Sequence, residues 1–254
     1  MKVSNYTLEF VCPEFTALNK KYLSKMQNSN AFTGFQKIKD DLINFSANEN
    51  PLIKSSEVEY FEFYWRWPKV EGKADEHWDC FGIDINSAYA TILHRDGFIS
   101  NETFEFILKL PKEDRLACVG MLAARKDIYI YSGGELIDMK QERSELEGYF
   151  FYCVQETQKA MRQCKLISNF YTIAHWVDCI YFYHDEFVES ILDELKKLGF
   201  RAKVDKLKDL TIQDTGKHYK LEFTKEKETK PKFLNFPKTN TNLRQEILKE
   251  FNLI

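Results

Sequence analysis

In the segment WDCFGIDINSAYATIL, residues 78–93, a run of apolar, strand-forming residues ends in a polar cluster around Asp84. A second apolar segment, YTIAHWVDCIYFY at 171–183, contains Asp178. Both runs predict buried β-strands. For either aspartate alone, a structural role at a strand end or in a turn is the simpler explanation. Two such strands side by side, however, would bring both carboxylates to one pair of divalent cations, which relieves the cost of burying them.

The rest of the chain alternates between helical and extended patterns. Apolar spacing predicts helices at 15–26, 35–45, 101–126 with a break at Pro111, 143–164, 186–198 with Gly199 as the stop, and 241–251. Further strands are expected at 57–68, 128–131, 135–139, 201–207, 210–213 and 218–223. We therefore expect an α+β fold with one mixed or antiparallel sheet.

Composition excludes several classes of protein. The 254 residues are 44% hydrophobic and 30% charged, which is enough apolar material for a packed core. No stretch reaches the ~20 consecutive apolar residues of a membrane helix, and the first residues lack a signal-peptide pattern. The six cysteines contain no CxxC pair, so we expect reduced thiols and a cytoplasmic, intracellular location without membrane contact.

Charge is distributed unevenly along the chain. The net charge is −3, but residues 196–254 carry 15 Lys and Arg against 8 Asp and Glu, which leaves the remainder strongly acidic. This asymmetry points to an anionic partner for the C-terminal region, although a solvated lysine-rich surface is the simpler explanation.

Common catalytic motifs do not occur. The sequence has no GxSxG, no GxxxxGK[ST] and no GxGxxG, and its five histidines have no paired metal-binding spacing. Cys179 lies in an apolar run with no evident base, which favours a core residue over a nucleophile.

Taken in order, four short motifs resemble those of family B DNA polymerases. Asp84-Ile-Asn-Ser87-Ala-Tyr89 is similar to motif A, D-x-x-S-x-Y-P, and Lys112 stands eight residues before Gly120 as in motif B, K-x-x-x-N-S-x-Y-G. The stretch 177–182 is similar to the second half of motif C, where Asp-Thr-Asp-Ser runs into an apolar strand. Residues 217–219 match K-x-Y.

The sequence also departs from these motifs. Ala90 replaces the proline of motif A, and only the lysine and glycine of motif B are kept. Trp176 occupies the position of the first motif C aspartate. A shifted register, with Asp178 as the first aspartate, puts Ile180 in place of the second and fits the trailing strand less well.

The resemblance implies a polymerase-type palm, backed by helices and carrying reduced helical fingers. Asp84 and Asp178 would be catalytic and would bind two Mg²⁺ ions, with Mn²⁺ as a substitute. The remaining implied roles concern substrate. Nucleotide binding is implied for Ser87, Tyr89, Lys112 and Arg115, and nucleic-acid binding for Lys217 and Tyr219.

The implied organisation has five segments. They are an N-terminal α/β segment of unknown role at 1–77, a first palm segment at 78–100, a fingers-like insertion at 101–142, a second palm segment at 143–224, and a basic tail or minimal thumb at 225–254. The economy of the chain suggests a phage or other mobile element, with a bacterial or phage-infected host.

Three hypotheses follow. In the first, the chain is an exonuclease-free DNA polymerase that adds deoxynucleotides to the 3′-hydroxyl of a DNA primer-template, with room for accessory replication proteins. In the second, it is a palm-derived protein without catalysis that binds nucleic acid or another partner. In the third, it is an unrelated α+β domain whose motifs coincide by chance, and then Asp84 and Asp178 need not lie side by side.

Overall fold

The computed structural model describes residues 29–45, 51, 53, 60–64, 72–73, 79–132, 135–216 and 218–237. The helices expected at 15–26 and 241–251 lie outside the described residues, as do most of the strand expected at 57–68 and the residue Lys217. The chain divides into two compact units, one formed by 1–58 and 87–156 and the other by 59–86 and 157–254.

The first unit is mainly helical. Its described elements are α2 (Asn30–Phe45), α3 (Ala88–Arg95), α4 (Asn101–Lys109), α5 (Lys112–Gly120), the 3₁₀ turn η2 (Met121–Ala123), the hairpin β4 (Arg125–Ser132) and β5 (Glu135–Arg143), and the first turns of α6 (Glu147–Ser168). The expected break at Pro111 is confirmed, since α4 ends before it and α5 begins directly after it. The expected hairpin is also confirmed and is longer than the apolar runs suggest.

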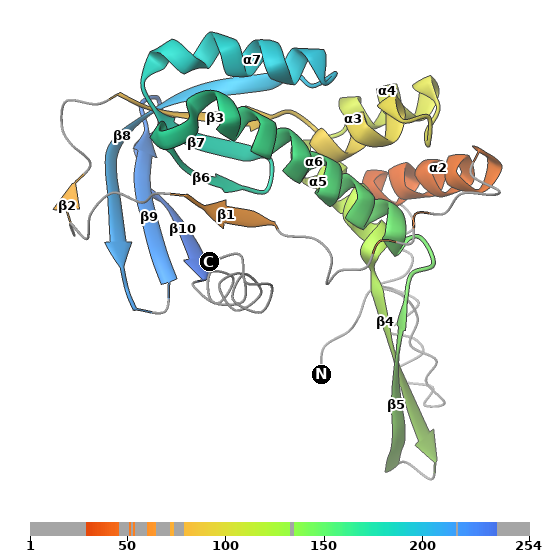
Figure 1. The fold of residues 1–254 in the computed structure, drawn as a ribbon. Helices are drawn as coiled ribbons and strands as arrows, with labels where there is room; N and C mark the ends of the chain where they lie inside the picture. Colours follow the sequence, from red (N-terminus) through yellow and green to blue (C-terminus); the bar gives the residue numbers. More distant parts are fainter. Residues whose placement is uncertain are drawn as a thin grey trace, which may run out of the picture. The chain divides into compact units, whose positions relative to one another are not determined.

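The second unit is built on one antiparallel sheet. Its strands are β1 (Phe61–Phe63), β2 (Gly72–Lys73), β3 (Cys80–Ile85), β6 (Thr172–Trp176), β7 (Cys179–Tyr183), β8 (Ala202–Asp214), β9 (His218–Lys225) and β10 (Lys232–Pro237). Their order is β1-β6-β7-β3-β8-β9-β10, with β2 also paired to β8 (Figure 1). Every pairing among the described strands is antiparallel, so the expected α+β class with an antiparallel sheet is confirmed.

The central strands and their helices follow a β-α-β-β-α-β order. Helix α6 precedes β6 and β7, and the 3₁₀ turn η3 (Asn169–Tyr171) joins it to β6. The 3₁₀ turn η4 (Asp185–Phe187) and α7 (Val188–Lys197) connect β7 to β8. In space the strands lie β6-β7-β3-β8, so the first strand is enclosed between the third and the fourth.

The two helices lie close together. Glu194 on α7 is near enough to Cys164 on α6 to affect its thiol, whose pKa is raised to about 12 mainly by burial and secondarily by this carboxylate. After α7, Gly199 adopts φ 83°, which is the left-handed stop that its position predicts.

The opposite face of the sheet, which we call the inner face, buries an aromatic cluster. Its members include Phe61, Phe63, Trp176, Tyr181, Tyr183, Tyr219, Phe223 and Phe236. The sheet coils so far that its two edge strands meet, because Phe61 on β1 lies 6.0 Å from Phe236 on β10, ring centre to ring centre. Coiling of this kind follows from the right-handed twist of strands and buries apolar area that a flat sheet would expose.

Candidate functional site

Strand β3 places Asp84 on the inner face. Residues two apart on a strand share a face, and Cys80 belongs to the inner cluster, so Gly82 and Asp84 face inward as well. An ideal Cβ on Gly82 would lie 3.2 Å from Cε1 of Tyr181, so a side chain here would require the Tyr181 ring to shift. Asp84, next along the inner face, is half-buried at the end of the strand.

The second aspartate lies in a hairpin turn. The prediction of one continuous strand over 171–183 is wrong, because the chain reverses at Val177 and Asp178 between β6 and β7. Val177 has φ 54°, a conformation rarely adopted by a β-branched residue. Its N–H donates to the carbonyl of Tyr60 at 2.6 Å, so a contact to the chain before β1 fixes the turn.

The strand register brings the two aspartates together. β3 and β7 are neighbours, and Asp84 lies directly opposite Cys179, the residue after Asp178. The N–H of Ile85 also donates to the carbonyl of Asp178 at 2.9 Å, which joins the end of β3 to the turn. Asp84 at the end of β3 and the turn that contains Asp178 are therefore neighbours in the backbone, which a shared metal site requires and a chance coincidence of motifs does not.

The surroundings of these carboxylates are chemically distinctive. Burial raises the pKa of the Cys179 thiol well above its usual range, and the charges of Asp84 and Asp178 raise it further. Burial also raises the pKa of the Tyr181 hydroxyl, with both carboxylates contributing. The thiol is therefore protonated near neutral pH, in agreement with a core role for Cys179 rather than a nucleophilic one.

Trp176 stands where the resemblance to motif C would place the first aspartate. Its ring stacks on Phe61 at 5.0 Å between centres and meets the edge of Phe236 at 5.1 Å. The hairpin consequently contributes a single carboxylate, Asp178, and Asp84 contributes the other.

This donor set suits Mg²⁺. A magnesium site in a phosphate-processing protein uses one or two carboxylates and completes its coordination with water and substrate oxygens. Asp84 and Asp178 supply two carboxylates at one end of the sheet. Among the described residues there is no group of three or more His, Cys, Asp or Glu side chains suited to a metal ion.

Ser87 and Tyr89 follow β3 in the chain but belong to the first unit. Ser87 has φ 53° and begins the turn into α3. The Tyr89 ring meets Phe150 edge to face at 5.4 Å, and its carbonyl accepts a weak hydrogen bond from the Cys153 thiol at 3.7 Å. The start of α3 therefore packs against α6.

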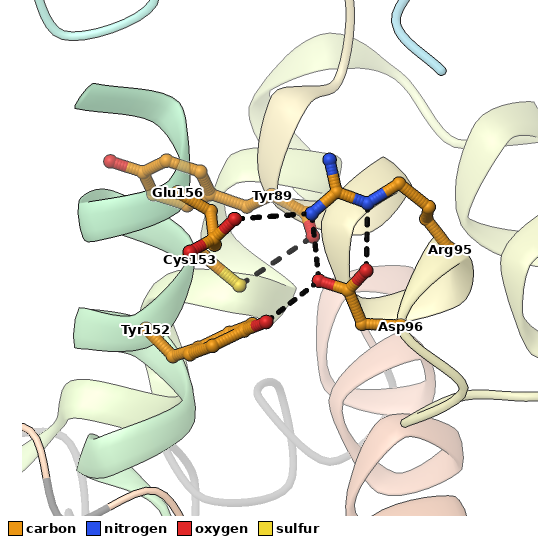
Figure 2. Close-up of polar contacts among 6 residues, drawn as sticks. All are labelled: Tyr89, Arg95, Asp96, Tyr152, Cys153 and Glu156. Atoms are coloured by element: carbon orange, nitrogen blue, oxygen red, sulfur yellow. Dashed lines mark hydrogen bonds and ion pairs between the residues drawn. The ribbon is translucent and has the colours of Figure 1, made fainter. Parts of the chain in front are cut away.

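A polar cluster at the other end of α3 strengthens this packing (Figure 2). Arg95 holds Asp96 through two hydrogen bonds of 2.7 and 2.8 Å and reaches Glu156 on α6 at 3.4 Å. Tyr152 on α6 donates to Asp96 at 3.0 Å, and its pKa is raised mainly by burial and then by this bond. Sequence reasoning missed this cluster, whose members lie about 60 residues apart in the chain.

Lys112 and Arg115 lie on α5, also in the first unit. Lys112 is exposed at the first residue of the helix. The Arg115 guanidinium donates to the carbonyl of Leu108 at 3.1 Å and so caps the end of α4. A structural role for Arg115 is thus visible, whereas its role toward a nucleotide stays a prediction.

Of the K-x-Y residues, only His218 and Tyr219 are described. Tyr219 stands on β9, partly buried, with its ring stacked on Phe63 at 4.4 Å between centres. Tyr219 therefore contributes to the inner aromatic cluster, and contact with nucleic acid stays a prediction.

Three charged residues near Asp84 were not predicted. Asp205 on β8 forms ion pairs with Lys203 on the same strand, at 2.7 Å, and with Lys225 on β9. In the sequence, Lys203 and Asp205 could be recognised only by the alternation of charged residues in RAKVDKL. The same alternation is found in an ordinary strand with one face in solvent.

Comparisons with known proteins do not identify the chain. No family model, no curated protein and no solved structure matches it. Across the residues that the structure describes, no helix has the length and apolar character needed to cross a membrane.

Proposed function

We propose that the chain is a DNA polymerase-like nucleotidyltransferase built on a palm domain. The observation that carries this proposal is the register between β3 and β7, which joins Asp84 to the turn containing Asp178. The antiparallel sheet, the long helix before the hairpin and the helix after it support this proposal.

In this function, Asp84 and Asp178 would hold Mg²⁺. When bound, the metal would stabilise the charges on the attacking 3′-hydroxyl oxygen and on the leaving pyrophosphate of a deoxynucleoside triphosphate. The protein keeps the two carboxylates at one end of the sheet through the paired strands and the turn at Val177. Fixed carboxylates need little reorganisation when the substrate binds, and such preorganisation lowers the barrier to reaction.

The test is extension of a labelled primer on a DNA template with four deoxynucleotides and Mg²⁺, with Mn²⁺ in parallel. We expect Asp84→Asn and Asp178→Asn to lower the rate about a hundredfold or more, since several kcal/mol of transition-state stabilisation would be lost. Asp193→Asn on the exposed side of α7 is the matched control and should keep the wild-type rate. Equal activity in all three variants would exclude the two aspartates from catalysis.

A second function is favoured by the packing of Trp176. Because an aromatic ring fills the first motif C carboxylate position, the chain also fits a palm-derived protein that binds nucleic acid without catalysis. Primer-template binding by folded wild-type protein, with no extension in Mg²⁺ or Mn²⁺, would establish this alternative.

A further inference from the structure

Lys203, Asp205 and Lys225 lie on the inner face beside Asp84. On the β3–β8 ladder, Lys203 is directly opposite Asp84 and Asp205 is directly opposite Gly82. Paired residues on antiparallel strands point to the same face, with Cβ atoms about 4.5–5.5 Å apart. Lys225 belongs to the same face, because it pairs with Leu207, a member of the inner cluster.

Asp205 holds both ammonium groups. Its side chain is only 12% exposed, and it pairs with Lys203 at 2.7 Å and with Lys225, whose side chain is 18% exposed. Burial acts to raise the pKa of Asp205, but hydrogen bonds from the two lysines outweigh it and the pKa is lowered. Asp205 therefore keeps its negative charge at neutral pH, and with the two lysines the group has a formal net charge of +1.

Lys225 acts electrostatically on the same thiol as the two candidate catalytic carboxylates. The Cys179 thiol experiences the charges of Asp84, Asp178 and Lys225 together. A phosphate group brought to Asp84 would also lie near Lys203, which stands directly opposite Asp84 on β8.

We propose that Lys203 and Lys225, positioned by Asp205, form a phosphate-binding subsite next to Asp84. Lys203 is the contact residue, because its side chain is 58% exposed while that of Lys225 is mostly buried. Asp205 fixes the direction of both ammonium groups. A role of this subsite in catalysis rests on the proposed function. Its binding of phosphate does not depend on that function.

The first experiment measures binding of a labelled DNA primer-template at several salt concentrations, without Mg²⁺ or nucleotide. Lys203→Gln is compared with Lys196→Gln, which changes an exposed lysine on α7. If Lys203 contacts a backbone phosphate, its variant binds more weakly and the slope of log K against log salt falls by about 0.7–0.9. The Lys196 variant should match wild type.

A second arm distinguishes backbone phosphate from nucleotide phosphate. Binding of inorganic tripolyphosphate is measured by calorimetry for the same two variants. Weaker tripolyphosphate binding with unchanged DNA binding would assign the subsite to the nucleotide, and the converse would assign it to the DNA backbone. If Lys203→Gln changes neither, the subsite does not exist, and the three residues form only a structural ion pair.

Asp205→Asn tests positioning as distinct from charge. Removing a negative charge would by itself tighten binding to any polyanion, whereas loss of positioning leaves affinity unchanged or weaker. Tighter binding of the folded variant would overturn the positioning role of Asp205. If this variant does not fold, the comparison of Lys203→Gln with Lys196→Gln still tests whether the subsite exists. Primer extension by the Asp84 variant is read separately, so the polymerase proposal can fail while the subsite stands.

Discussion

Acidification should destabilise the second unit through one buried histidine. His175 on β6 is fully buried, and its Nδ1 lies 2.8 Å from the hydroxyl of Tyr64. That hydroxyl donates to Glu62 at 3.0 Å, so we assign the proton between Tyr64 and His175 to Nδ1. Among the described side chains, Nε2 of His175 is the buried polar atom without a hydrogen-bond partner.

Protonation of this ring in the native state is unfavourable. Burial lowers the pKa of His175 from 6.5 to about 4; Glu62 opposes the shift, while Arg162 and Lys165 reinforce it. The unfolded chain therefore binds a proton below about pH 6.5 while the native ring stays neutral, and stability is lost as the pH falls from there toward 4. At pH 5 the loss amounts to about 2 kcal/mol.

The measurement is urea denaturation followed by circular dichroism at pH 7 and pH 5. His175→Asn is the informative variant, because its amide nitrogen replaces Nδ1 as a donor to Tyr64 without titrating. Other groups also titrate in this range, so the quantity of interest is the difference between proteins. Wild type should lose about 2 kcal/mol more than the variant between the two pH values. His218→Asn, at an exposed position on β9, is the matched control substitution.

Equal pH dependence in wild type and His175→Asn would show that His175 is not the source of the lost stability. Because the smaller side chain leaves a cavity, the variant should be less stable at both pH values, and only the difference between them is diagnostic. If the variant does not fold, an NMR titration of the His175 ring in wild-type protein gives the same information. A measured pKa of about 6 or above would contradict the proposed burial effect.

Two substitutions test packing and capping. Gly82→Ala places a Cβ 3.2 Å from the buried Tyr181 ring and should lower the free energy of unfolding by about 1–3 kcal/mol; an unchanged urea midpoint would show that the ring shifts freely. Ser100→Ala removes the oxygen that accepts from the Thr103 N–H at 3.2 Å, and the hydroxyl that donates to Asp41 at 2.8 Å. We expect a loss of about 1–2 kcal/mol in thermal or urea denaturation, and wild-type stability would contradict the role of this cap.

Local chemistry made much of the fold predictable. Proline cannot continue a helix and glycine readily adopts positive φ, so the break at Pro111 and the stop at Gly199 follow from the sequence. The strands were predictable from their apolar runs, and the α+β class from the order of strands and helices, but the sequence left a mixed sheet and an antiparallel sheet open. The helix break and the helix stop depend on residues near one another in the chain, whereas the strand pairing joins distant segments.

The hairpin between β6 and β7 was not predictable in this way. Its turn has Val177 at positive φ, where a β-branched side chain is unfavourable, and no glycine or asparagine marks the reversal. The conformation depends on pairing of β7 with β3 and on the hydrogen bond from Val177 to Tyr60. Tertiary contacts therefore override the local backbone preference of Val177 at this turn. Strained backbone of this kind often occurs near functional residues.

The candidate site was predictable only partly, for the same reason. Asp84 and Asp178 stand out because each interrupts an apolar segment. Asp205 and Lys225 do not, because they are 20 residues apart on strands full of other charges and are joined only by the β8–β9 pairing. Charged residues on a solvated strand and charged residues at a site look alike in one sequence.

The short strand β1 has a consequence for aggregation. Strand β6 and its neighbour β7 are rich in aromatic and β-branched residues, carry little charge and contain no proline, which is typical of segments that form cross-β fibrils. β7 is enclosed between two strands, whereas the described residues that cover the other side of β6 are β1 and the flanking Tyr60 and Tyr64, which form backbone hydrogen bonds with Val177 and Ile173. This short segment therefore protects the edge of β6, since without it a second chain could pair with that edge.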